Sequence, residues 1–122
     1  MAYTAIAPQE VLTAYISEGA AVQMTTLTFT AGDNTNLNLV TMPGRKMLLL
    51  ITNTSGGAAG TVTIAAADDP YGRTAPITAF SVADGAFAAR IFEPVGWEQT
   101  LGGRDILITP SAVTMEILAI PL

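Results

Sequence analysis

The chain has 122 residues, a formal net charge of −5, and neither cysteine nor histidine. This length suits one domain with a single packed core, and the missing residue types exclude disulfides, thiol catalysis, imidazole bases and zinc sites built from Cys or His. The negative balance opposes nucleic-acid binding, because phosphate contacts need clustered Lys and Arg.

Hydrophobic residues make up 50% of the chain and charged residues only 12%, about half of the roughly 25% typical of globular domains. No apolar run approaches the roughly 20 residues that span a bilayer, and the N-terminus lacks the basic and continuous apolar regions of a secretory signal. We therefore expect a protein without a membrane partner that hides its apolar surface in an assembly.

Residues 1–21 are the most ambiguous segment. Pro8 could open a short helix in which Val11 lies above Tyr15, with Leu12 paired in the same way to the residue four positions later. Alternate residues from Val11 onward also fit a strand. Because the segment is rich in Ala and Thr and precedes the first clear strand, we favour an N-terminal arm.

From residue 22 onward the pattern is that of short strands. Residues 22–29 form the first, provided that a bulge at Thr25–Thr26 returns its apolar side chains to one face. Residues 37–41 form the second, after a turn at 32–34.

The next two strands are predicted from residues 46–64. An apolar run ends at Asn53, crosses a Gly-rich stretch at 56–60 and re-emerges as alternating Thr and apolar residues at 61–64. Alternation indicates a half-buried strand and the glycines permit a chain reversal, so we predict an antiparallel hairpin.

A second hairpin is predicted for residues 77–82 and 86–92. The sequence Ala83-Asp84-Gly85 between them is a tight-turn signal, because glycine accepts a positive φ without a Cβ clash. Strands at residues 106–108 and 113–120 complete the chain.

Seven or eight strands spaced about ten residues apart, without a clear helix, are typical of a β-sandwich or a barrel, and of these we predict a single-domain, all-β sandwich over residues 22–122. The predicted core consists of the larger apolar side chains of the alternating segments: Val62, Ile64, Phe80, Phe87, Ile91, Ile106, Ile108, Met115 and Ile117.

The polar residues do not assemble into a predicted active site. The pair Asp68–Asp69 lacks the further oxygen ligands at the spacing that calcium requires, and is better explained as a solvated loop. Glu93 and Glu98 flank Trp97 like a glycosidase pair beside a sugar-stacking ring, but packing explains the tryptophan more simply. We predict no catalytic, cofactor-binding or metal-binding residues and no enzymatic activity.

The last strand is apolar on both faces. Val113, Met115 and Ile117 lie on the face expected for the core, whereas Leu118 and Ile120 lie on the face where solvent is expected. Such a strand is covered twice, by its own core and by something else. A position at the centre of a two-layer core is one explanation, and we favour burial by a partner.

The order of these features resembles the small capsid decoration, or cement, proteins of tailed phages. Five segments carry the resemblance: residues 44–57, 61–64, 82–86, 90–94 and 105–120. The resemblance implies a jelly-roll sandwich, often trimeric, at local three-fold positions of the capsid exterior. Such a protein braces the major capsid protein without catalysis, is found in the virion and, during assembly, in the host cytoplasm, and often reaches a neighbour with an N-terminal arm.

We therefore predict a homotrimer bound to the major capsid protein, with no cofactor. The predicted interface residues are Val11, Leu12, Tyr15, Trp97, Leu118 and Ile120. The competing function is a carbohydrate- or cell-surface-binding module of a phage fibre, for which Tyr71, Trp97 and Asn34 could supply the binding groups.

Overall fold

The computed structural model describes residues 3–11, 26–67, 75–99 and 104–122. Six residues named above lie outside the described residues: Leu12, Tyr15, Thr25, Asp68, Asp69 and Tyr71. Within the described ranges all regular secondary structure is β, arranged in two sheets.

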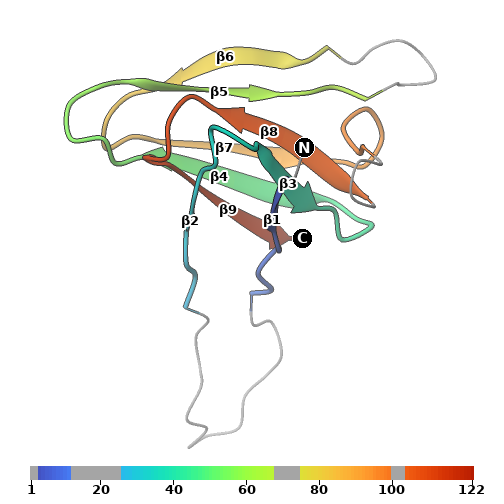
Figure 1. Ribbon diagram of the computed structural model, residues 1–122. Coiled ribbons are helices and arrows are strands. Elements are labelled where there is room, and N and C mark those ends of the chain that lie inside the picture. Colours follow the sequence, from blue (N-terminus) through green and yellow to red (C-terminus); the bar gives the residue numbers. More distant parts are fainter. Residues whose placement is uncertain (1–2, 12–25, 68–74, 100–103) are drawn as a thin grey trace, which may run out of the picture.

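The two sheets lie one over the other in Figure 1. The five-stranded sheet has the order β1 (Thr4–Ile6), β3 (Asn38–Thr41), β8 (Asp105–Pro110), β5 (Gly60–Ile64) and β6 (Ile77–Val82). The four-stranded sheet has the order β2 (Thr30–Ala31), β9 (Met115–Pro121), β4 (Met47–Asn53) and β7 (Phe87–Phe92). The prediction of an all-β sandwich is confirmed.

Both predicted hairpins are wrong, because each pair of strands is divided between the two sheets. β4 pairs with β7 and β9, whereas β5 pairs with β6 and β8. The turn between β6 and β7 forms as predicted, with Gly85 at φ 76° and a 3.0 Å hydrogen bond from Ala86 N to Ala83 O. It links two sheets, however, and not two neighbouring strands. A Gly-rich loop specifies a reversal of the chain without specifying the strand that the chain pairs with next.

The strands β2 to β9 pair in a nested order. β5 pairs with β6, β4 with β7, β3 with β8 and β2 with β9, and all four pairs are antiparallel. The contacts of β9 with β4 and of β8 with β5 join these pairs into sheets. Most strands are therefore held by segments distant in sequence.

Six of the nine predicted core residues are buried. Val62, Ile64, Ile106, Ile108, Met115 and Ile117 are each no more than 4% exposed. They project between the sheets together with residues that the prediction did not include, among them Leu49, Ile51 and Phe92. The alternating pattern therefore identified the centre of the core, where every strand has neighbours on both sides.

The predicted burial of Phe80, Phe87 and Ile91 is wrong, since their side chains are 52%, 66% and 53% exposed. Ile91 lies opposite Leu48 on the outer face of its sheet, and Phe87 lies on that same face. Phe80 lies opposite buried Val62 and so faces the interior, but β6 is an edge strand with no further strand to cover it. An alternating pattern shows which residues share a face of a strand. It does not show whether the strand lies at the edge or in the centre of its sheet.

The first two predicted strands also differ from the structure. Within the described part of residues 22–29, residues 26–29 form no strand, and β2 covers only Thr30–Ala31. The strand predicted at residues 37–41 begins at Asn38, because Leu37 has a φ of 65°, outside the extended region.

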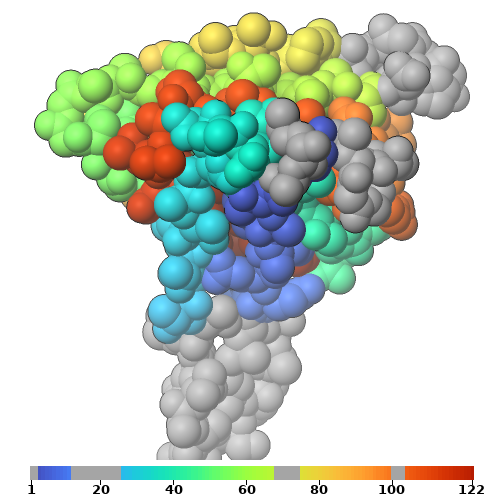
Figure 2. Space-filling view, viewed as in Figure 1, coloured from blue at the N-terminus to red at the C-terminus, as the bar shows by residue number. Residues whose placement is uncertain are grey.

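Part of the predicted N-terminal arm is a strand of the sandwich. β1 runs parallel to β3, and its Ile6 is 3% exposed within the core. Gln9 then donates a backbone hydrogen bond of 2.8 Å to Ala119 O on β9. Figure 2 shows residues 3–11 in blue beside residues 26–31 in light blue, below the main body of the sandwich.

Candidate interaction surface

A groove opens where both sheets end on the same side of the sandwich. Among the described strands, β6 has only β5 as a neighbour and β7 only β4, and a cavity of about 570 Å³ lies between these edges. Its lining is mostly apolar and includes Leu49, Val62, Ile77, Phe80, Val82, Ala88 and Phe92. We call this cavity the β6–β7 groove. Its volume falls in the range of roughly 300–1,000 Å³ typical of ligand sites.

One end of the groove is held by the buried side chain of Asn53. The Asn53 Nδ2 donates hydrogen bonds to Val82 O at 3.0 Å and to Ala58 O at 2.8 Å, while its Oδ1 accepts one of 3.1 Å from Ser55 N. The backbone oxygen of Asn53 also accepts a bond of 2.8 Å from Gly85 N. One asparagine thus ties the end of β4 to the β4–β5 loop and to the β6–β7 turn.

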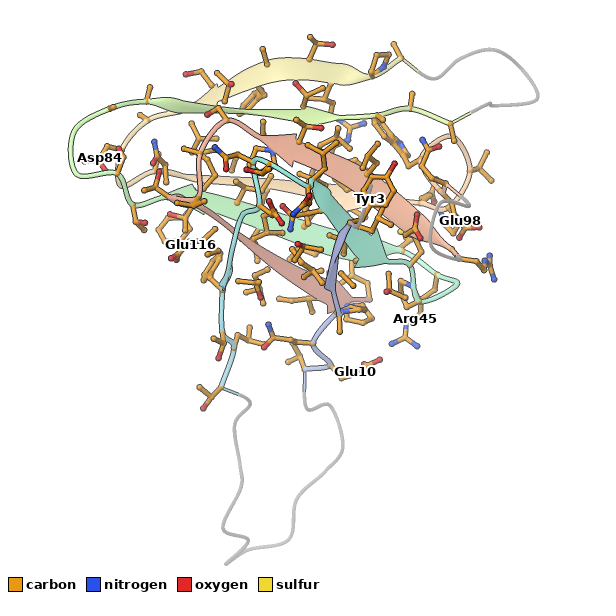
Figure 3. The ribbon with its side chains drawn as sticks, in the orientation of Figure 1. Tyr3, Glu10, Arg45, Asp84, Glu98 and Glu116 are labelled. Carbon is orange, nitrogen blue, oxygen red and sulfur yellow. The ribbon has the colours of Figure 1, made fainter. Side chains whose placement is uncertain are left out.

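Two further hydrogen bonds fix that turn. Thr52 Oγ1 donates to Ala86 O at 3.0 Å, and Asp84 Oδ1 accepts from Gly56 N at 2.9 Å. Figure 3 shows Asp84 at this end of the sandwich, with Arg45 near the opposite end. These hydrogen bonds therefore fix the position of the β6–β7 turn, where the two edges of the groove meet.

The β6 edge is irregular in its middle. The register with β5 shifts between Val62 and Ile64, and Ala79 on β6 has a φ of 50°. Its backbone N donates to Thr63 Oγ1 at 3.0 Å, in place of a ladder hydrogen bond. Such a bulge twists an edge strand and hinders pairing with a further strand. The β7 edge keeps a continuous register with β4 from Phe87 to Phe92.

Of the described residues that line the groove, Arg90 alone is charged. It lies opposite buried Leu49, so its side chain projects toward the interior. The guanidinium carbon lies 5.6 Å from the ring centroid of Phe92 and 5.5 Å from that of Trp97. Within the described residues Arg90 forms no ion pair. Cation–π contacts of this kind stabilise an exposed cation by only about 0.5–1 kcal/mol each.

The outside of the same edge is also apolar. Phe87, Ala89 and Ile91 are exposed on β7 and lie in register with β4, where Leu48 and Leu50 are half-buried. We call these five residues the outer β7 face. The ring of Phe29 meets that of Phe87 at 6.1 Å, at one end of this face. Large apolar side chains grouped on a surface mark a site of interaction.

The predicted interface residues are not brought together. Val11 is 40% exposed at the end of a described segment, and Trp97 is half-buried, with its ring edge-on to Phe92 at 4.9 Å. Leu118 and Ile120 are only 3% and 8% exposed within this one chain. A partner could cover almost nothing of these two side chains on β9, whereas β7 offers it the exposed side chains of Phe87 and Ile91. The absence of charge in residues 77–82 and the single charge in residues 87–92 were the signal in the sequence that could have found this surface.

The residues considered for sugar chemistry are also separated. Glu93 pairs with Lys46 at 3.7 Å and Glu98 with Arg104 at 2.9 Å, so each carboxylate has its own cation. Asn34 reaches Ser111 O just after β8, whereas Trp97 lies near Gln99, which bridges to Asp105 at the start of β8. A strand of this length separates them by roughly 15–20 Å.

Asp33 stabilises the turn between β2 and β3. Its Oδ1 accepts hydrogen bonds from Asn36 N at 2.8 Å and Thr35 N at 3.0 Å, and its Oδ2 accepts one from the Thr4 hydroxyl on β1. The backbone bond from Asn36, followed by the Thr4 and Thr35 bonds, lowers the pKa of Asp33 from its usual 3.8. The folded chain therefore favours the charged form of this half-buried carboxylate.

The described residues contain no group of three or more His, Cys, Asp or Glu placed to hold a metal ion. They also contain no helix long and apolar enough to cross a membrane. The comparisons with known proteins identify no relative: no family model, curated protein or solved structure matches the chain.

Proposed function

We propose that this chain is a non-enzymatic virion protein that decorates and stabilises the exterior of a tailed-phage capsid. It binds the major capsid protein, as a homotrimer at local three-fold positions. The proposal follows from the resemblance of five sequence segments to capsid decoration proteins. The all-β sandwich with an exposed apolar flank supports it.

The finer fold proposed with this function is a jelly roll. A jelly roll consists of eight strands in two sheets, and the nested pairs from β5·β6 out to β2·β9 supply such a set. In this arrangement a long double ribbon of strands wraps around one core. β1 adds a parallel edge strand to the five-stranded sheet.

The observation that carries the proposal is the apolar flank around β7. Phe80, Phe87 and Ile91 are all more than half exposed in the isolated chain. Burying apolar surface stabilises a complex by about 25 cal/mol for each Å². A neighbouring protein that covers this flank would therefore form a complex stabilised by the removal of these three side chains from water. Repeated contacts over a capsid then add to give avidity, even where each contact is weak.

The proposal assigns a second contact with the capsid to the N-terminal arm, around Val11, Leu12 and Tyr15. Val11 is 40% exposed, and the preceding residue, Glu10, is tied to the domain through an ion pair of 2.9 Å with Arg45 (Figure 3). An arm that continues from this anchor would contribute to capsid binding more than to the domain's own folding.

The experiment compares phage heads with and without this protein. Heads assembled without it should form but release their genome at a lower temperature than decorated heads, or under osmotic shock. Purified protein added to the bare mature heads should restore their resistance, and electron microscopy should place its density on the outer surface. Equal resistance of bare and decorated heads would contradict the stabilising role, and absence of the protein from the particle would contradict the assignment to the virion.

A further inference from the structure

We propose that the β6–β7 groove binds an extended polypeptide segment of a partner protein, which pairs with β7 and presents a carboxylate to Arg90. The inference does not depend on the capsid assignment, since it follows from the backbone edges, the lining and the charge of the groove.

The backbone of β7 indicates that the occupant is a polypeptide. β7 pairs with β4 along one side, and no described strand pairs with its other side. That side offers a row of N–H and C=O groups, which an added strand would satisfy and a lipid or other apolar molecule would not.

The sequence of β7 does little to prevent such pairing. Natural edge strands are protected by charged side chains, proline, bulges or short length. β7 is six residues long, has no bulge in its register with β4 and contains one charged residue, Arg90. β6, the other edge of the groove, has a bulge and a left-handed residue at Ala79. We therefore assign the pairing to β7.

The lining of the groove sets the side chains of the occupant. Side chains of a strand alternate between two faces, so every second residue of an added strand would enter the groove. There they would meet Phe80 and Ile77 of β6 and Ala88 of β7, which favour apolar groups of moderate size. The same insertion would cover Phe80, which is 52% exposed in the isolated chain.

Arg90 sets the charge of the occupant. It projects into the groove without an ion pair in the described chain and rests against the rings of Phe92 and Trp97. A carboxylate beside it would form a charge-assisted hydrogen bond in a partly apolar setting, stronger than a neutral one. The occupant is thus an extended segment with alternating apolar residues and one Asp or Glu on the same face.

The probe is a synthetic heptapeptide, capped at both ends, in which threonine alternates with two valines and one aspartate. Two relatives serve as comparisons: one with asparagine in place of aspartate, and one with proline in place of the third of its four threonines. Proline lacks the N–H that strand pairing needs. Trp97, the only tryptophan of the chain, lies against Arg90 and reports binding by fluorescence.

We expect the aspartate peptide to bind about fivefold more tightly than the asparagine peptide, the size of effect that a partly exposed ion pair gives. The proline peptide should bind at least tenfold more weakly. In the Arg90→Gln variant the difference between the aspartate and asparagine peptides should disappear. The Arg45→Gln variant, changed near the opposite end of the sandwich, should keep it. On binding, amide hydrogen exchange should slow along the open edge of β7.

Three results would overturn the proposal. The first is equal binding of the aspartate peptide and the proline peptide, which would show that the peptide does not pair with β7 as a strand. The second is failure of all three peptides to bind at millimolar concentration. The third is self-association of the chain that competes with the peptide and slows the same β7 amides, which would make a second copy the occupant. A second check is the Ala88→Leu variant, whose larger side chain fills the groove from β7 and should weaken binding of the aspartate peptide. Its thermal unfolding must first be shown to match that of the original chain.

Discussion

At the scale of single residues, one buried polar side chain, that of Asn53, holds the loops at one end of the groove in place. Asn53 is fully buried, and both hydrogens of its Nδ2 and its Oδ1 have protein partners. A buried polar group is costly when unsatisfied, so a fully bonded asparagine specifies one arrangement of the loops around it. In this chain that arrangement determines where β6 ends and β7 begins.

Replacing Asn53 by Ala should lower the free energy of unfolding by about 2–4 kcal/mol, because it leaves the buried Val82 carbonyl and a further carbonyl without their donor. Urea denaturation followed by Trp97 fluorescence measures this change. The matched control is Asn34→Ala, which removes only an exposed contact of 3.5 Å to Ser111 O and should change stability by less than about 0.5 kcal/mol. Equal effects of the two substitutions would contradict the role given to Asn53.

Asp33 makes stability depend on pH in the acid range. Its pKa is lowered in the folded chain by the hydrogen bonds from Asn36, Thr4 and Thr35, so its contribution is complete above the unfolded value near 3.8. The contribution is lost as the pH falls through the lower, folded pKa. The Asp33→Asn variant should therefore be less stable than the original chain at pH 6 and approach it below pH 3. A difference in unfolding free energy that is the same at pH 6 and pH 2.5 would contradict this account.

At the scale of elements, the sequence predicts where strands lie better than which strands pair. Residues 47–53 and 60–64 were found by their apolar and alternating patterns, and the turn before β7 by Gly85. Pairing partners could not be found in this way, because β4 meets β9, which is distant in sequence. The surface around β7 was missed for the same reason, since an edge strand is defined by the neighbour that it lacks.

β1 was hidden in a segment with a weak pattern. Only three residues pair with β3, and Ile6 alone of them is buried in the core. A strand this short has too few alternating residues to stand out in the sequence, and its parallel partner lies more than thirty positions later.

The Ile6→Ala substitution should lower the free energy of unfolding by about 2–4 kcal/mol, the usual cost of a cavity in a core. Ala5→Ser, at the neighbouring exposed position, serves as the control and should have little effect. A small change for Ile6→Ala in thermal or urea unfolding would mean that β1 behaves as part of a detachable arm and not as a strand of the sandwich.

At the scale of the whole molecule, the outer β7 face is the surface that we expect the proposed trimer to bury. We predict that the double variant Phe87→Ser with Ile91→Ser weakens the proposed trimer at least tenfold, since it removes the two most exposed side chains of that face. Sedimentation velocity across a range of concentrations measures the change. The control is Val113→Ser, which alters an equally exposed apolar side chain in the turn before β9. A trimer that is unchanged by the double variant would place the interface elsewhere.

The nested pairing also governs when the molecule can fold. Thr30 pairs with Ile117, and β4 needs β7 on one side and β9 on the other, so the central ribbon is incomplete until β9 has been made. Folds dominated by such distant pairs form in milliseconds to seconds, far more slowly than chains with local contacts. A growing chain that has not reached β9 carries β4 with apolar side chains on both faces and one edge open. We therefore expect folding to be completed only after β9 has been made, and a chain interrupted before that point to expose the apolar faces of β4 to chaperones and proteases.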